Sequence, residues 1–401
     1  MIILGPGAGP PCLNLNKGHM NKLFPLFLAL LFLARFPCQG QEPSDSLLLA
    51  IRPYGSFRGH FAIYNDEIEI QENGSRIGVE LSVTQGNVRY FAATELGINM
   101  FRSNVVFNAD ASTRGGFVVI ESDQQNQVFS TRLGFLGVDL GPMGTLTLGK
   151  QWSVFYDITG YTDKFNVFGG QASATYVGGT DGGTTGTGRA DQSLIYRNAF
   201  GPVRIGAQLQ MRTVANDRFI DGLAFSGQFS PLRGLNLGAA YNRSFFNDLL
   251  KETTIGFGGD PSYFSAGASF SNPSWDIGLV FVSQSNGDVV ESFIAQQEEA
   301  AVVFDARGME AFIRFKLPKF AFLGGFNGYY PDTEDLPIYQ GFKTEYYVLG
   351  MEFKPLAHAY FYAEYRLSQG RSSNGLSQFD VFTLGLRFDL ERTWSRAFPV
   401  N

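Results

Sequence analysis

Apolar and polar residues alternate in short runs along most of the chain, and the last run is the clearest. From Phe382 to Leu390 every second residue is apolar, and Arg387 and Asp389 are among the polar residues between them. Successive side chains of a β-strand point to opposite faces, so this run predicts a strand with one apolar and one polar face. Further runs of this kind lie at 76–83, 203–212 and 359–367.

These runs favour a membrane barrel over a soluble β-sandwich, in which strands also alternate. They are about 10 to 13 residues long, which suits tilted strands that cross hydrocarbon better than the ~5–6 residues of a soluble strand. Backbone groups in lipid must be bonded within the protein, so the sheet has to close. Aromatic residues that suit interfacial girdles lie near the run ends, at Tyr329-Tyr330, Tyr346-Tyr347, 360–362 and Phe388.

Short and long connections also alternate, as they do in outer-membrane barrels. We therefore predict an all-β transmembrane antiparallel barrel of about sixteen strands, a size that leaves an aqueous lumen. The predicted long loops lie near 104–127, 153–188, 284–307 and 330–343. The predicted short turns lie at 140–144, 200–202, 231–234, 272–273 and 316–319.

The only long apolar run lies near the start of the sequence, from Leu23 to Phe36, and follows Lys22. It is shorter than the ~20 residues of a spanning helix, and small residues follow it, so residues 1–40 are interpreted as a secretory signal region. The predicted start is Met20 and the predicted cleavage is before Gln41. Residues 41–401 then form the barrel domain.

Loss of residues 1–40 changes the composition of the exported chain. Both cysteines leave with it, as do three basic residues and no acidic one. The count falls from 31 to 28 basic residues against 37 acidic ones, and the net charge becomes −9. An acidic chain argues against nucleic acid as a partner. The total says little about solutes, because a pore responds to the charges in its lumen.

The segment 153–188 is too long for an ordinary hairpin connection, and loops of this length are usually functional or disordered. Its first half is aromatic, and its glycine-rich second half, 178–186, favours flexibility. Its motifs include Gly160-Tyr161-Thr162-Asp163, Phe168-Gly169-Gly170 and Gly188-Arg189, with Tyr196-Arg197-Asn198 just beyond the loop. Upstream, two strands begin with the motifs at 75–78 and 131–137.

In their order and spacing these motifs resemble the trimeric general diffusion porins of Gram-negative bacteria, over about residues 75–210. The resemblance implies an outer-membrane homotrimer whose third loop folds into the barrel and narrows it. It also implies that wall arginines face carboxylates on that loop. The matching positions are Arg76, Arg132 and Arg189 on the wall and Asp163 on the loop.

Two departures from the family pattern bear on this interpretation. The second loop acid of the family is Val167 here, and the proline before it is Asn166, so the acidic side of the constriction should be weaker. Family members usually end in an aromatic residue, but residues 391–401 follow Phe388-Asp389-Leu390. That tail could enter the barrel, extend the sheet or hang free.

The arginines also have an ordinary interpretation, as solvated side chains or as partners of Glu80 and Glu95 on neighbouring strands. Four more arginines point inward by strand parity, and for them ordinary lumen lining is favoured: Arg58, Arg89, Arg204 and Arg212.

The sequence contains no pattern typical of an enzyme, a cofactor or a metal site. The three histidines and two cysteines lack metal-ligand spacing, and neither a Gly-x-Ser-x-Gly elbow nor a phosphate-binding loop occurs. We predict a non-enzymatic, water-filled channel for passive diffusion of ions and small hydrophilic solutes. The alternatives are a porin selective for phosphate or sugars, a plugged adhesin or structural barrel, and a lipase-type barrel whose site assembles across strands.

Neutralising Arg76 and Arg132 should shift the reversal potential in planar bilayers toward cations, because two fixed positive charges leave the lumen. An unchanged ion selectivity would remove both residues from the constriction.

Overall fold

The computed structural model describes residues 46–101, 128–179, 181–212, 219–246, 254–291 and 301–399. The predicted signal region 1–40 and the predicted loop 104–127 lie outside these residues.

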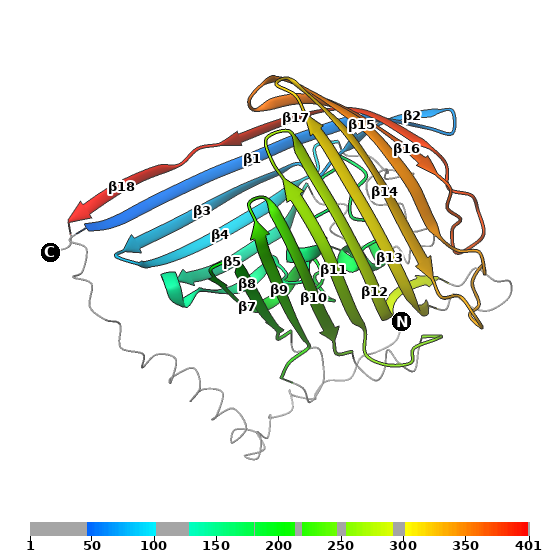
Figure 1. Ribbon diagram of the computed structural model, residues 1–401, viewed down its shortest axis with the longest axis horizontal. Helices are drawn as coiled ribbons and strands as arrows, with labels where there is room; N and C mark the ends of the chain where they lie inside the picture. Colours follow the sequence, from blue (N-terminus) through cyan, green and yellow to red (C-terminus); the bar gives the residue numbers. More distant parts are fainter. Residues whose placement is uncertain are drawn as a thin grey trace, which may run out of the picture. The chain divides into compact units, whose positions relative to one another are not determined.

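The described chain consists almost entirely of strands joined by turns and loops (Figure 1). The strands are β1 (Ser46–Tyr64), β2 (Glu67–Glu72), β3 (Arg76–Gln85), β4 (Val88–Ile98), β5 (Phe129–Asp139), β6 (Thr145–Trp152), β7 (Arg189–Phe200), β8 (Val203–Gln210), β9 (Gly222–Leu232), β10 (Leu235–Ser244), β11 (Ser262–Ser271), β12 (Trp275–Glu291), β13 (Ala301–Lys316), β14 (Phe320–Pro331), β15 (Thr344–Leu356), β16 (Ala359–Ser368), β17 (Val381–Glu391) and β18 (Trp394–Pro399). The helical turns are η2 (Gly141–Met143), α2 (Tyr156–Thr159) and η3 (Ala174–Gly179). None of the described helices is long and apolar enough to span a membrane.

Sixteen of these strands close into an antiparallel barrel, as the alternating pattern predicts. From β3 to β17 each strand pairs with the next one in sequence. The ring is completed by β1, which pairs with β3 on one side and with β17 on the other. Closure leaves no unbonded sheet edge within the ring, which is the condition for strands in hydrocarbon.

The two remaining strands extend members of the ring. β2 pairs with the end of β1 and leads into β3 through residues 73–75, where Gly74 has a φ of 66°. β18 continues β17 along β1, from Ile51↔Trp394 to Ser46↔Pro399. Figure 1 shows this red strand beside the blue β1. Of the three placements left open for the tail, the structure shows the sheet extension for residues 394–399.

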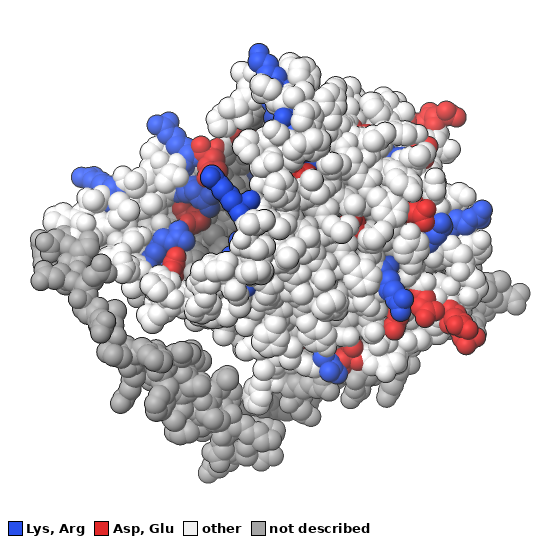
Figure 2. All heavy atoms as spheres, in the orientation of Figure 1, with Lys and Arg blue, Asp and Glu red and all other residues white. Residues whose placement is uncertain are grey.

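Side chains alternate between the two faces of the wall as predicted. In β17 the apolar residues from Phe382 to Leu390 are exposed outward, and the residues between them are buried or half-buried on the inside. The central surface in Figure 2 is correspondingly almost free of charged atoms.

The predicted aromatic girdle is only partly correct, because neighbouring residues in a strand face opposite sides. Tyr330 and Tyr347 are exposed, but Tyr329, Tyr346 and Tyr362 are buried.

The two ends of the barrel differ in their connections. One end, here called the turn end, carries the short turns at the predicted positions, such as Gly141–Met143. The other, the loop end, carries the long connections. The predicted loop 284–307 is wrong in its bounds, because β12 runs to Glu291 and β13 begins at Ala301 across a β-bulge. The paired ends of β12 and β13, which extend beyond the adjacent strands β11 and β14, occupy most of the predicted loop.

Leu386 is the middle residue of β17 and faces outward with 46% exposure. Leu386→Arg should destabilise the barrel in lipid by about 2–4 kcal/mol, because a charge at the bilayer midplane is unfavourable. The free energy of unfolding in urea, measured in lipid vesicles, checks this.

The matched control is Leu376→Arg, since Leu376 is exposed in the connection between β16 and β17. Equal losses in both variants would contradict a lipid-facing surface on β17.

Candidate functional site

The segment between Trp152 and Arg189, here called the inner loop, lies inside the barrel. It contains α2 and η3, and its side chains pack on inward residues of distant strands. Phe155 and Ile158 are fully buried in a cluster that includes Val280 of β12. The prediction that the segment 153–188 folds into the barrel is confirmed for its described residues.

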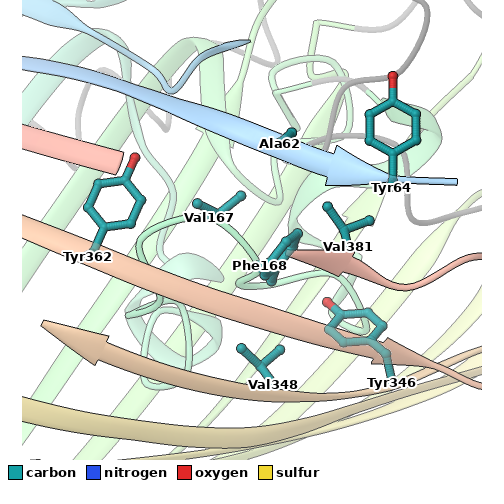
Figure 3. Close-up of a cluster of buried hydrophobic side chains, with 8 residues drawn as sticks. All are labelled: Ala62, Tyr64, Val167, Phe168, Tyr346, Val348, Tyr362 and Val381. Atoms are coloured by element: carbon teal, nitrogen blue, oxygen red, sulfur yellow. The ribbon is translucent and has the colours of Figure 1, made fainter. Parts of the chain in front are cut away.

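The tip of the inner loop is held to the wall by apolar contacts. Val167 is 2% exposed and Phe168 is 0% exposed. Full burial of such side chains is worth roughly 1.5–3 kcal/mol each. Figure 3 shows both among wall side chains of the same cluster: Ala62, Tyr64, Tyr346, Val348, Tyr362 and Val381.

Glu364 of β16 binds the same tip through its backbone. Its buried carboxylate accepts hydrogen bonds from three consecutive amides, those of Asn166 at 2.6 Å, Val167 at 2.9 Å and Phe168 at 3.3 Å. Hydrogen bonds to an ionised group are roughly twice as strong as neutral ones, and a buried carboxylate without partners would be strongly unfavourable. Glu364 therefore fixes the position of the tip.

Two further wall residues hold the loop on either side of its tip. Glu310 of β13 accepts hydrogen bonds from the Ser173 amide at 2.6 Å and from the Thr162 hydroxyl. Arg197 of β7 donates from Nε and Nη2 to the two carboxylate oxygens of Asp157, at 3.1 and 3.0 Å. Such a bidentate pair constrains orientation as well as distance.

Wall amides also hold the glycine-rich second half of the loop. Gln208 and Asn242 both donate to the Gly186 carbonyl oxygen at 3.0 Å. Gln210 donates to the Gly183 carbonyl oxygen at 2.8 Å. The flexibility expected from composition is therefore opposed by these wall contacts, which a single segment of sequence does not reveal.

A cavity of about 960 Å³ lies between the inner loop and the wall. Among the described residues, no three His, Cys, Asp or Glu side chains are arranged to hold a metal ion. The acidic residues that line the cavity are Glu95, Asp163, Asp181, Glu352 and Asp389. Its basic lining residues are Arg58, Arg76, Arg132, Lys164, Arg189, Arg314, Lys354 and Arg387.

Five of these arginines come from odd-numbered strands, of which β17, β1 and β3 are adjacent while β4 and β6 separate β3, β5 and β7. They are Arg387 from β17, Arg58 from β1, Arg76 from β3, Arg132 from β5 and Arg189 from β7. Inward parity and closure of the ring bring them to the same cavity. We call these five residues the arginine row.

The predicted pairing of an arginine with Glu95 holds for one member of the row. Arg132 Nε donates to Glu95 at 2.7 Å. Among the described residues, no carboxylate forms an ion pair with Arg76 or Arg58. Their charges are therefore uncompensated at contact distance.

Asp163 lies on the loop side of the cavity, as predicted from the motif. Its Oδ2 atom accepts hydrogen bonds from the hydroxyls of Tyr156 at 2.7 Å and Tyr176 at 3.2 Å. These neutral donors orient the carboxylate and leave its negative charge in place.

Asp181, a second loop carboxylate, is compensated by two cations. It lies 2.7 Å from Lys150 Nζ and 3.4 Å from Arg189 Nε. Burial disfavours its charged form, but Arg189 and Lys150 outweigh burial, so the pKa of Asp181 lies below its ordinary value.

The four residues predicted for the constriction all line this cavity: Arg76, Arg132, Arg189 and Asp163. Their role in narrowing a channel stays a prediction.

The four arginines predicted to be ordinary lumen lining do not all lie at this cavity. Arg58 lines the cavity, whereas Arg89, Arg204 and Arg212 are not among its lining residues. Arg89 instead pairs with Glu80 at 3.2 Å beside a smaller cavity of about 390 Å³. Strand parity indicates the face on which a residue lies but not its height along the barrel, and this explains the difference.

Several residues of the site were not predicted from the sequence. Glu310, Glu364 and Arg387 lie at inward positions of alternating runs, so parity gives their face but not their place in the site. Gly308 had no such signal. A Cβ atom there would overlap the carbonyl oxygen of Ala172, so glycine allows the loop backbone to touch the wall.

Comparisons with known proteins agree with this architecture. The family description "Gram-negative porin" matches residues 54–395. Outer membrane porin F of Salmonella typhimurium is 26% identical over 256 residues, which are 60% of this chain and 68% of that protein. Outer membrane protein S2 of Salmonella typhi is 31% identical over 154 residues, which are 35% of this chain and only 34% of that protein.

A solved structure shows the same fold. Salmonella typhi OmpF in complex with daunomycin superposes with a TM-score of 0.66 at 16% identity, and the match covers 85% of this chain and 97% of that one.

Glu364→Ala should loosen the tip of the inner loop, because three backbone amides lose their charged acceptor. Each such bond contributes roughly 1.5–3 kcal/mol. We expect larger current fluctuations in single-channel recordings than those of the unmodified protein.

Glu334→Ala, which changes an exposed acid in the loop after β14, serves as the control. If both variants record alike, Glu364 does not hold the loop.

Proposed function

The chain belongs to the Gram-negative porin family, and on that premise we propose that it forms a water-filled channel through the outer membrane. Ions and small hydrophilic solutes would cross it by passive diffusion, and no catalytic step is involved.

The observation that carries this proposal is the division of the wall into two faces. The outward residues of the strands are apolar and exposed, as hydrocarbon contact requires. The inward residues include apolar ones that pack against the inner loop, and charged side chains of both signs line the inner cavity. A barrel of sixteen strands is wide enough to hold water inside.

The inner loop supports a size limit on the solutes. It occupies part of the interior and is fixed there by Glu310, Glu364 and Arg197. Solutes must then pass between the loop and the arginine row. Opposed charges at such a narrowing orient water and polar solutes, so both size and charge affect passage.

We propose a homotrimer as the assembled form, on the basis of the sequence resemblance to trimeric general diffusion porins. The alternatives are a substrate-selective pore and a plugged structural barrel. A cavity lined by charged groups on both the wall and the loop favours an open path over a plug.

Purified protein in planar bilayers should give discrete conductance steps. In liposomes, swelling rates should fall smoothly with the size of the added sugar, because an open lumen discriminates by size. Native mass spectrometry of the detergent-solubilised complex measures whether three chains assemble.

Three results would count against these proposals. Complete absence of conductance favours the plugged barrel. Swelling that is faster with one sugar than the size of that sugar predicts favours a selective pore. A monomeric mass rejects the trimer.

A further inference from the structure

The described cavity carries an excess of positive charge, although the whole chain is acidic. Eight basic and five acidic residues line it, which leaves a net charge of +3. The full sequence has a formal net charge of −6. Because low-dielectric walls focus the field of nearby charges, the lining and not the total sets the ion preference.

Two members of the arginine row lie directly opposite each other. Arg58 of β1 and Arg387 of β17 are register partners in the antiparallel pair, and both side chains reach the cavity. Like charges at directly opposed positions destabilise a sheet. Such an arrangement is more easily explained by a ligand of opposite charge than by folding.

A hydrogen-bonded network holds the Nε atoms of both guanidinium groups. Arg58 Nε donates to Ser56 Oγ at 2.7 Å, and Ser56 Oγ donates to Asp389 Oδ1 at 2.6 Å. Arg387 Nε in turn donates to both oxygens of Asp389, at 2.9 Å each. Ser56 is only 6% exposed, so the network is anchored in the wall.

The Nη1 and Nη2 atoms of both arginines remain available to bind a ligand. Among the described residues, the hydrogen bonds of Arg58 and Arg387 use Nε, and none uses an Nη atom. The Arg387 guanidinium lies 5.5 Å from the centre of the Tyr360 ring, which limits its movement. Two oriented guanidinium groups match the paired oxygens of an oxyanion better than they match a spherical ion.

We propose that Arg58 and Arg387, with Arg76 beside them, form a binding site for small oxyanions such as inorganic phosphate, and that the channel consequently prefers anions. The proposal rests on the proposed channel function and adds the class of solute that it favours. The five acidic residues of the lining are too few to reverse the sign against eight basic ones, and the loop position at which the family resemblance places a further acid is Val167 here.

The unmodified protein is tested in planar bilayers under a KCl gradient. Chloride should permeate more readily than potassium. The preference should be stronger in dilute salt, because the Debye length falls from about 30 Å at 0.01 M to about 3 Å at 1 M. Inorganic phosphate, added at matched ionic strength, should reduce the chloride current.

Variants separate charge from geometry. The double variant Arg58→Gln and Arg387→Gln should lose most of the anion preference, and half-block should need about tenfold more phosphate. Arg58→Lys keeps the charge but loses the planar fork, so it should keep the preference for chloride and still weaken the block by phosphate. Arg233→Gln, in an exposed turn, removes one positive charge away from the cavity and should change neither readout.

The outcomes distinguish the two levels of the proposal. Absence of conductance overturns the channel itself. Conductance with a preference for potassium leaves the channel intact and overturns the oxyanion site. A chloride current that inorganic phosphate does not reduce at matched ionic strength has the same consequence. Circular dichroism of each variant confirms that its barrel has formed.

Discussion

The structure depends on one constraint, which is that hydrocarbon offers no hydrogen-bond partner to a backbone amide or carbonyl group. The chain meets it by pairing β17 with β1, so that the sixteen-strand ring is complete. Closure also defines an inside and an outside for every strand. The apolar residues face outward, and the polar residues are left to line a shared interior, where their chemistry can act on solutes.

The interior is organised by contacts between the wall and the inner loop. Buried carboxylates of β13 and β16 bind loop amides, and small wall residues such as Gly308 allow the two backbones to touch. The loop is therefore part of the packed interior and not an appendage. This rigidity matters electrostatically, because a fixed loop keeps Asp163 across the cavity from the arginine row.

Much of this could be predicted from the sequence, because a period of two residues is a local property. The unusual length of the connection gave the bounds of the inner loop, and the resemblance to general diffusion porins gave Arg132 and Arg189 as wall residues. The period itself identified the outward face of β17 and placed Arg58 and Arg76 on the inward face. It could not give the height of a residue in the barrel, so Arg89 and Arg204 were grouped with Arg58. It placed Glu364 on an inward face but could not reveal its partners, which lie about 200 residues away in the chain.

The extension of the last strand has a consequence for the behaviour of the protein outside the membrane. Among the described strands, β18 pairs with β1 alone, so its other edge could recruit a strand from a second molecule. Arg396 and Pro399 belong to this strand, and cationic side chains and proline are residues that discourage such recruitment. The segment therefore carries its own protection against aggregation where the sheet does not close.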